Sequence, residues 1–197
     1  MRIPSILRPL AILTAITPIA VFCLSCNAPR AAPVAAPAPR NDGLILQDNE
    51  GERRVRRNAG KGPFIIKVDR HNGGSPDLVM GYEDIAPGAE IQLHRHLVAD
   101  EILFVHRGTG TASLNGRKAH VSAGATIYVP RNVTIGLVND GTEPLGITFT
   151  FSKPGFEELM RDNSVLEGQP VTPMSAEERA RIQARHRWHT IVGPPPP

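Results

Sequence analysis

Short apolar runs separated by glycine, proline and asparagine fill residues 62–151, and this pattern limits the fold more than any other feature of the chain. No stretch between the runs has the period of an amphipathic helix. The pair Asn115-Gly116 is typical of the tight turn of a β-hairpin. Many short strands with turn residues between them indicate an antiparallel barrel or jelly roll, so we predict an all-β domain. Strands are expected at residues 64–68, 78–83, 91–96, 101–107, 110–114, 119–121, 126–129, 134–139 and 145–151.

Helices are expected only after this region. A short one is predicted at residues 156–161. Ser175 and Glu178 match a capping box, in which the serine side chain accepts a hydrogen bond from the backbone and the glutamate reaches back. The capping box predicts a second helix at residues 176–186. Its apolar face is thin, so we expect it to pack loosely on the barrel or on a second subunit.

Two histidines, His186 and His189, lie at the end of this second helix. Basic side chains at that position complement the negative end of the helix dipole. We interpret the pair in this way, rather than as a metal or ligand site.

The first 26 residues have the composition of an export signal. Arg2 and Arg8 give the segment a basic start, and the stretch 10–26 that follows is mostly apolar. It is shorter than the ~20 residues that a membrane-spanning helix needs, and it contains Pro18. We therefore expect an exported protein, located in the periplasm or anchored to the membrane as a lipoprotein.

The end of this segment resembles a bacterial lipobox. Cys26 follows Leu24-Ser25, and in a lipobox the cysteine is lipidated and becomes the new N-terminus. Cys23 occupies a position where leucine, valine or isoleucine is usual. The alternative is a conventional cleavage further on, between residues 28 and 36. Lipidation of Cys26 would give the mature protein a membrane anchor.

Cysteine usage and charge exclude several classes of function. Both cysteines, Cys23 and Cys26, lie in the signal, so the mature chain has no cysteine nucleophile, no disulfide and no thiolate metal ligand. Removing Arg2 and Arg8 from the 22 basic residues leaves 20, against 19 acidic residues. A chain so close to neutral is not expected to have a nucleic-acid partner.

These patterns divide the chain into four parts. The expected parts are an export signal at residues 1–26, a Pro/Ala-rich and basic linker at 27–58, the barrel at 59–153, and a helical extension with a proline tail at 154–197. The linker should be extended and semi-rigid. Its basic run, Arg53 to Arg57, is interpreted as solvated linker or a first edge strand. The alternative is a patch that touches anionic lipid headgroups.

Two histidines and a glutamate are the candidate site residues. His94 and His96 alternate on an expected strand, so both side chains point to the same face, about 6.6 Å apart along the strand. Two neutral imidazoles on one face can bind a single divalent metal. Glu101 begins the next expected strand. If it points into the barrel, three ligands converge and His106, on the same strand, points away.

The spacing of these residues resembles motif 1 of the cupin superfamily, which is matched by Gly88, His94, His96, Glu101 and Gly108. A second segment resembles motif 2 through Gly124, Pro130 and Asn139, with Asn132 in place of a glycine. The resemblance covers residues 62–151. It implies a double-stranded β-helix, the jelly-roll barrel of cupins, with the short C-terminal helices as an appendage. It also implies a metal held by the two histidines and the glutamate, and a homodimer.

Ile135 departs from the family pattern, because motif 2 supplies its last histidine ligand at this position. Isoleucine cannot coordinate a metal, and three alternatives follow. His94, His96 and Glu101 could hold a metal alone, as a two-histidine-one-carboxylate set that suits Fe(II) oxygenase chemistry. His120 could replace the missing ligand. The third alternative is a metal-free pocket that binds a small molecule.

The predicted function is that of an exported cupin that binds a divalent metal (Fe, Mn, Ni or Zn) and a small organic ligand. If the protein is an enzyme, the resemblance implies dioxygenase- or isomerase-like chemistry, and quercetinase-like dioxygenases are one similar group. The alternative is a non-catalytic small-molecule or sugar-binding cupin at the cell envelope, without metal. Ile135 favours this alternative because it puts an apolar wall where a ligand should be. A third hypothesis is an envelope structural protein with a vestigial site.

Overall fold

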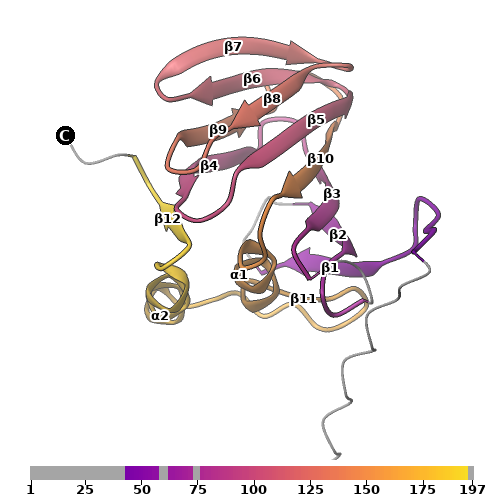
Figure 1. Cartoon of the computed structure of the whole chain (residues 1–197), viewed down its shortest axis with the longest axis vertical. Helices are drawn as coiled ribbons and strands as arrows, with labels where there is room; N and C mark the ends of the chain where they lie inside the picture. Colours follow the sequence, from indigo (N-terminus) through magenta and orange to yellow (C-terminus); the bar gives the residue numbers. More distant parts are fainter. Residues whose placement is uncertain (1–42, 58–61, 73–75, 195–197) are drawn as a thin grey trace, which may run out of the picture. The chain divides into compact units, whose positions relative to one another are not determined.

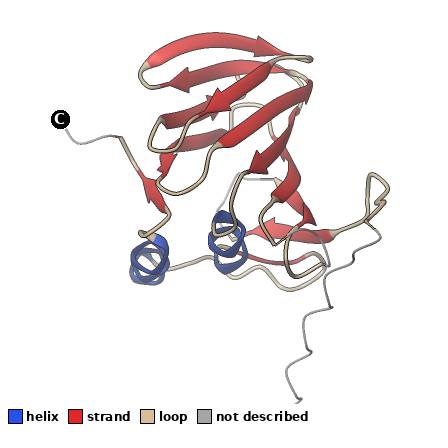
Figure 2. Ribbon diagram, in the orientation of Figure 1, coloured by secondary structure: helices blue, strands red, loops and turns tan. Residues whose placement is uncertain are grey.

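Two antiparallel sheets face each other and form the body of the structure (Figures 1 and 2). The computed structural model describes residues 43–57, 62–72 and 76–194. The predicted signal and its Cys26 lie outside these residues, as does most of the predicted linker. Two helices lie together at one end of the sheets (Figure 1). The all-β fold with short C-terminal helices is therefore confirmed.

Within the described residues, one sheet has seven strands and the other has five. The seven-stranded sheet has the order β11 (Ser164–Leu166), β1 (Glu52–Arg56), β2 (Pro63–Val68), β3 (Val79–Ile85), β10 (Leu145–Phe151), β5 (Glu101–Arg107) and β8 (Thr126–Val129). The five-stranded sheet has the order β12 (Thr190–Val192), β4 (Glu90–His96), β9 (Thr134–Val138), β6 (Thr109–Leu114) and β7 (Arg117–Ser122).

Strand β5 shows how the sequence pattern fixes the inner and outer faces. Glu101, Leu103 and Val105 are buried, whereas Ile102 and Phe104 are exposed. Successive side chains of a strand point to opposite faces, so the buried set lies between the sheets. The core contains residues of both sheets, among them Phe64, Ile66, Val79, Leu103, Val105, Leu137, Leu145, Ile147 and Phe149.

Two turns depend on residues that tolerate positive φ. Asn115 (φ 48°) and Gly116 (φ 80°) form the turn between β6 and β7. Leu114 at the end of β6 pairs with Arg117 at the start of β7, so the predicted hairpin is confirmed. Asn132 has φ 68° at the position where the cupin pattern has a glycine. Asparagine is one of the few other residues that adopt this conformation readily, so the replacement keeps the turn.

The basic run is part of the seven-stranded sheet and is covered on both sides. β1 pairs with β2 on one side and with β11 on the other, so it is neither solvated linker nor an edge strand. Arg56 pairs with Glu83 and lies over the ring of Phe64, and Arg53 pairs with Glu167. Sequence reasoning could not foresee this placement because β11, which covers β1, follows it by more than a hundred residues.

The C-terminal helices form close to where they were predicted. Helix α1 spans Phe156–Asp162 and helix α2 spans Ala176–His186. The Ser175 side chain accepts a hydrogen bond from the backbone N–H of Glu178, as expected. The Glu178 carboxylate accepts two hydrogen bonds from Arg57. These bonds lower the pKa of Glu178, and a backbone hydrogen bond with Ser175 also lowers it, as the predicted capping box implies. The apolar contact of helix α2 is small, as predicted. Its Ile182 packs with Leu159 and Met174 in a cluster separate from the main core.

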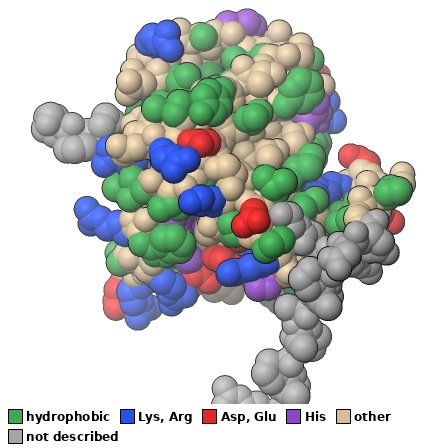
Figure 3. Space-filling view, in the orientation of Figure 1, with side chains coloured by type: hydrophobic (Ala, Val, Ile, Leu, Met, Phe, Trp, Pro, Cys, Tyr) green, Lys and Arg blue, Asp and Glu red, His purple; other side chains and the backbone are tan. Residues whose placement is uncertain are grey.

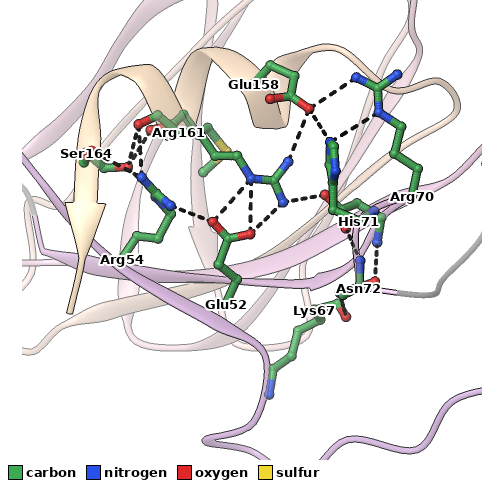
Figure 4. A network of polar contacts seen from close by, with 11 residues as sticks. Glu52, Arg54, Lys67, Arg70, His71, Asn72, Glu158, Arg161 and Ser164 are labelled. Atoms are coloured by element: carbon green, nitrogen blue, oxygen red, sulfur yellow. Dashed lines mark hydrogen bonds and ion pairs between the residues drawn. The ribbon is translucent and has the colours of Figure 1, made fainter. Parts of the chain in front are cut away.

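Arg161 joins α1 to the start of the barrel. Figure 4 shows its guanidinium between Glu52 of β1 and Glu158 of α1, and it also pairs with the buried Asp69. Asp69 in turn accepts hydrogen bonds from the backbone N–H groups of His71 and Asn72. These contacts hold α1 against β1 and the segment after β2.

The outer face of the seven-stranded sheet carries apolar side chains. Ile102 and Tyr128 are register partners on β5 and β8, and Phe104 lies on the same face, all three exposed. Figure 3 shows hydrophobic side chains exposed on the surface. Among the described residues, no helix combines the length and apolar character that crossing a membrane requires.

Candidate metal centre

The structure brings the three predicted ligand residues together between the two sheets. His94 and His96 lie on β4 of the five-stranded sheet, and Glu101 is the first residue of β5 in the other sheet. Their side chains are almost fully buried, with 6%, 2% and 3% of the surface exposed. One donor atom from each residue lies within 4.8 Å of the other two. The alternation of β4 and the position of Glu101 therefore produce the convergence that the sequence predicts.

Hydrogen bonds on the far side of each imidazole orient both rings. His94 Nδ1 lies 2.8 Å from the carbonyl oxygen of Gln92. A carbonyl oxygen can only accept, so Nδ1 of His94 carries the proton and Nε2 keeps its lone pair. His96 Nδ1 lies 3.2 Å from the hydroxyl of Thr190 on β12. Both rings therefore use Nδ1 for the protein, which leaves Nε2 for the site.

Two of the donor atoms lack a hydrogen-bond partner among the described residues. They are Nε2 of His96 and Oε2 of Glu101, which lie 3.4 Å apart. A buried polar atom without a partner costs about 1–3 kcal/mol, so these atoms favour an additional group between them. Two donors that each lie about 2.1 Å from one ion at a tetrahedral angle are about 3.4 Å apart. The residues present thus fit a divalent metal.

Burial sets the protonation of the three residues. It lowers the pKa of His94 to about 4, with a smaller effect of the same sign from His96, and it lowers the pKa of His96 to about 4. Burial raises the pKa of Glu101 to about 7, against the opposing effect of His94. At neutral pH both imidazoles are therefore neutral, which is the form that binds metal. The contact between His96 and Glu101 is accordingly not an ion pair.

Ile135 faces the site as the sequence implies. It is the register partner of His94 on β9 and is 1% exposed. His120 cannot replace the missing histidine, because it is exposed on β7, at the opposite edge of the five-stranded sheet from β12. His106 points away from the site and stacks on Tyr82 at the surface, as expected. Of the three alternatives, the one that uses His120 is therefore wrong.

An aromatic side chain from helix α1 covers the two histidines. The ring of Phe156 in α1 stacks on His94 at 5.8 Å between centroids and meets His96 edge-on at 4.7 Å. Phe151 at the end of β10 contacts both His96 and Phe156. Nothing in the sequence marks Phe156 as part of the site, because it belongs to the predicted appendage.

The C-terminal histidines have specific partners, so their interpretation as simple complements to the helix dipole is wrong. His186 Nδ1 and His189 Nε2 lie 3.0 Å apart, and both side chains are buried. His186 Nε2 lies 2.7 Å from a carboxylate oxygen of Asp162 in α1. His189 Nδ1 lies 2.8 Å from the hydroxyl of Thr190, the same hydroxyl that contacts His96.

A cavity of about 480 Å³ adjoins the three ligand residues. Its walls are mostly apolar and include Ile91, Leu103, Ile135, Leu137, Ile147, Phe149 and Phe156. His94 and Glu101 line it, and exposed side chains of α2, Arg179 and Gln183, also border it. The cavity therefore connects the candidate metal centre with the protein surface beside α2, and its volume is that of a small-molecule site.

Comparison with protein families and curated relatives points to one group. Residues 81–151 match the sequence pattern of the family described as "Cupin domain". An uncharacterized protein of Methanocaldococcus jannaschii is 34% identical over 86 residues, which are 43% of this chain and 66% of that protein. The dimethylsulfoniopropionate lyase of Ruegeria pomeroyi is 29% identical over 83 residues, 42% of this chain and 53% of the lyase. The chain thus spans between half and two thirds of the length of these two relatives.

Solved structures share the fold. KdgF from Halomonas sp. has a TM-score of 0.50 and 22% identity, and the match covers 58% of this chain and 98% of KdgF. A predicted oxalate decarboxylase from Thermotoga maritima also has a TM-score of 0.50, with 16% identity, and covers 56% of this chain and all of that protein (100%). At this level of identity the likeness is one of fold.

Proposed function

This chain carries a domain of the cupin superfamily, and from that premise we propose that it binds a divalent metal ion beside a small organic molecule. The metal would be held by His94, His96 and Glu101, with Fe, Mn, Ni or Zn as the candidate ions. The organic molecule would occupy the adjoining cavity. Its apolar walls favour a ligand with a hydrophobic part, and the open side of the metal centre favours a polar group on that ligand.

One observation carries this proposal: His96 Nε2 and Glu101 Oε2 are buried, lack a partner among the described residues, and lie 3.4 Å apart. Placing such atoms in an apolar barrel is costly unless something binds them. The hydrogen bond from His94 Nδ1 to the Gln92 carbonyl also supports metal binding, because it leaves the lone pair of His94 Nε2 free for an ion.

The side chains around the centre have separable tasks. A bound divalent ion would supply a Lewis acid and a template for O₂ or for a polar group of the substrate. The two histidines present neutral Nε2 atoms, and Glu101 supplies negative charge. Phe156 keeps water from one side of the histidines, and the apolar walls orient the organic molecule. With three protein ligands rather than four, more coordination positions stay open, which suits dioxygenase-like or isomerase-like chemistry.

Metal content measured by mass spectrometry tests the proposal. The purified domain would be loaded with each candidate ion and desalted beside His94→Ala and Glu101→Gln variants. About one ion per chain is expected in the unchanged protein, with a large loss in both variants. His106→Ala is the matched control, because this histidine is exposed and points away from the site. Metal that is far below one ion per chain, or that is equal in all variants, contradicts the proposal.

A second candidate function is supported by Ile135. Its apolar side chain lies opposite His94 and lines the cavity, so the pocket could serve as a metal-free binding site for a small molecule or sugar. In that case His94, His96 and Glu101 would hydrogen-bond the ligand directly. The two functions differ in one measurement: a ligand that raises the melting temperature equally with and without a chelator supports the metal-free site.

Location and assembly complete the proposal. We propose export to the periplasm or the membrane surface, on the composition of residues 1–26, with Cys26 as the lipidated residue. We also propose a homodimer. The exposed Ile102, Phe104 and Tyr128 give the seven-stranded sheet an apolar outer face that two copies would bury, and the mass measured by light scattering tests this.

A further inference from the structure

We propose that the C-terminal segment fixes the tautomer of His96 through a chain of hydrogen bonds that begins at the carboxylate of Asp162. In this view Thr190, His189 and His186 are positioning residues. They hold the proton of His96 on Nδ1 and so keep the lone pair of Nε2 directed at the site. The benefit for metal binding rests on the proposed function, whereas the tautomer itself does not.

The chain is continuous from the surface to the candidate ligand. Asp162 Oδ2 lies 2.7 Å from His186 Nε2, and His186 Nδ1 lies 3.0 Å from His189 Nε2. His189 Nδ1 lies 2.8 Å from the hydroxyl oxygen of Thr190. That oxygen lies 3.2 Å from His96 Nδ1. Apart from Asp162, whose carboxylate is about one third exposed, these side chains are buried, so water does not compete for the bonds.

The direction of every bond follows from the first one when the imidazoles are neutral. A carboxylate can only accept, so Nε2 of His186 must carry a proton, and Nδ1 of His186 must then accept. His189 therefore donates through Nε2 and accepts at Nδ1. Thr190 has one proton, which it donates to His189, so its oxygen accepts from His96. The proton of His96 must then lie on Nδ1, which leaves Nε2 with its lone pair.

Backbone pairing holds the chain in place. β12 pairs with β4 so that Thr190 is the register partner of His96. The backbone N–H of Leu97 donates to the carbonyl of His189 at 2.7 Å, and that of Gly193 donates to Leu93 at 2.7 Å. At the other end, Arg185 donates to the same oxygen of Asp162 at 2.8 Å. The hydroxyl of Thr190 is thus placed by the sheet, and the carboxylate is placed by two helices.

Nuclear magnetic resonance of metal-free protein tests the tautomer directly. In protein with ¹⁵N-labelled histidine, two-bond ¹H–¹⁵N correlations distinguish a protonated Nδ1 from a protonated Nε2. We expect His96 as the Nδ1–H form, and His186 and His189 as the Nε2–H forms. A different tautomer at His96 in the unchanged protein overturns the inference, whatever the protein does with metals.

Variants then test whether the chain is the cause. Thr190→Val removes the hydroxyl and keeps the shape, so His96 should become a mixture of tautomers, while Thr190→Ser should restore the single form. Thr134→Val is the matched control, because it removes a buried threonine hydroxyl from β9, on the other side of β4. If Thr190→Val does not fold, Asp162→Ala at the surface decides, since it removes the acceptor that sets the direction. An unchanged His96 signal in the folded variants contradicts the proposal.

Metal affinity gives a second, separate readout. Groups that orient a metal-bound histidine typically contribute roughly 10- to 100-fold in affinity, so Thr190→Val should weaken binding of Zn²⁺ by a factor in this range, measured by competition with a chelator. Thr134→Val should bind as the unchanged protein does. If the unchanged protein binds no metal, the proposed function fails and the tautomer measurement still decides this inference. If it binds metal with the same affinity in Thr190→Val, the positioning role is wrong.

Discussion

Ile135 and His94 are register partners on neighbouring antiparallel strands, so their side chains lie next to each other on the inner face of the five-stranded sheet. Directly paired residues in such a ladder have Cβ atoms about 4.5–5.5 Å apart. A histidine at position 135 would therefore present its imidazole beside that of His94. His94, His96 and Glu101 converge as the motif predicts, and the side chain at position 135 separates this set from a four-ligand one.

Ile135→His should raise the affinity for Zn²⁺ by more than about tenfold, or ~1.4 kcal/mol, because it adds a fourth ligand to the existing three. Without metal the same variant should unfold more easily by about 1–3 kcal/mol, since the new imidazole has no partner. Isothermal titration and urea unfolding measure the two effects. Ile135→Leu serves as the control that keeps the wall apolar. Equal affinity in both variants would mean that position 135 does not reach the metal.

Arg161→Met should lower the free energy of unfolding by about 3 kcal/mol, because it leaves the carboxylate of Asp69 buried without its cationic partner. The loss would appear as a shift of the midpoint in urea. Arg181→Met is the matched control, since this arginine forms an exposed pair with Glu177 within α2 and should change stability by less than about 0.5 kcal/mol. If the two variants lost similar amounts of unfolding free energy, the contacts of Arg161 would stabilise the fold no more than an exposed ion pair does.

Stability should also fall on acidification in a way that depends on Arg161. Burial alone would raise the pKa of Glu52, but hydrogen bonds and charge from Arg161 and Arg54 outweigh it and hold the pKa below its ordinary value of 4.5. The stabilisation is therefore complete above pH 4.5 and is lost as the pH falls through the lower value in the folded state. Urea unfolding at a series of pH values should show a shallower acid decline in Arg161→Met than in the unchanged protein. Parallel declines would contradict this account.

Phe156→Ala should speed the release of bound metal to a chelator, because the ring that covers His94 and His96 is removed and water reaches both. The unfolding free energy should fall by about 2 kcal/mol, less than for a fully buried phenylalanine, since Phe156 is only partly buried. Ile45→Ala removes an apolar side chain that is 88% exposed and belongs neither to the site nor to the proposed dimer face, so it is the control. Release at the unchanged rate would show that the ring does not shield the site.

Cys26→Ser should release the protein from membranes into the soluble periplasmic fraction, because serine cannot carry the lipid. Fractionation followed by immunoblotting measures the distribution. Cys23→Ser is the matched control, which changes the neighbouring cysteine and keeps the proposed lipidation site. Membrane association that persists in Cys26→Ser would contradict the lipobox interpretation.

Local patterns made much of the fold and site accessible from the sequence. The period of two along β4 placed His94 and His96 on one face, and the turn residues before and after β5 placed Glu101 at its start. These features depend on residues close together in the chain, and the fixed spacing of the motif carries them. The position of Ile135 beside His94 followed from the same motif.

The contributions of the C-terminal segment could not be foreseen, because they depend on pairings between distant residues. The sequence around Thr190 gives no sign that β12 pairs with β4, and without that pairing the hydroxyl has no relation to His96. Phe156 lies on α1, which ion pairs through Arg161 and the packing of Met160 in the core join to the barrel. His186 and His189 looked like the polar end of a helix because their partners, Asp162 and Thr190, lie outside that helix.

The pairing of β4 with β12 also orders events during synthesis. The hydrogen bond between His96 and Thr190 joins residues 94 positions apart. At typical translation rates of about 5–20 residues per second, roughly 5 to 20 s pass between the two. Throughout that interval His96 lacks the strand that orients it, and for most of the interval it also lacks Phe156 of α1. If the site binds metal as proposed, an ion that met the chain before β12 had paired with β4 would find His96 without the strand that orients it.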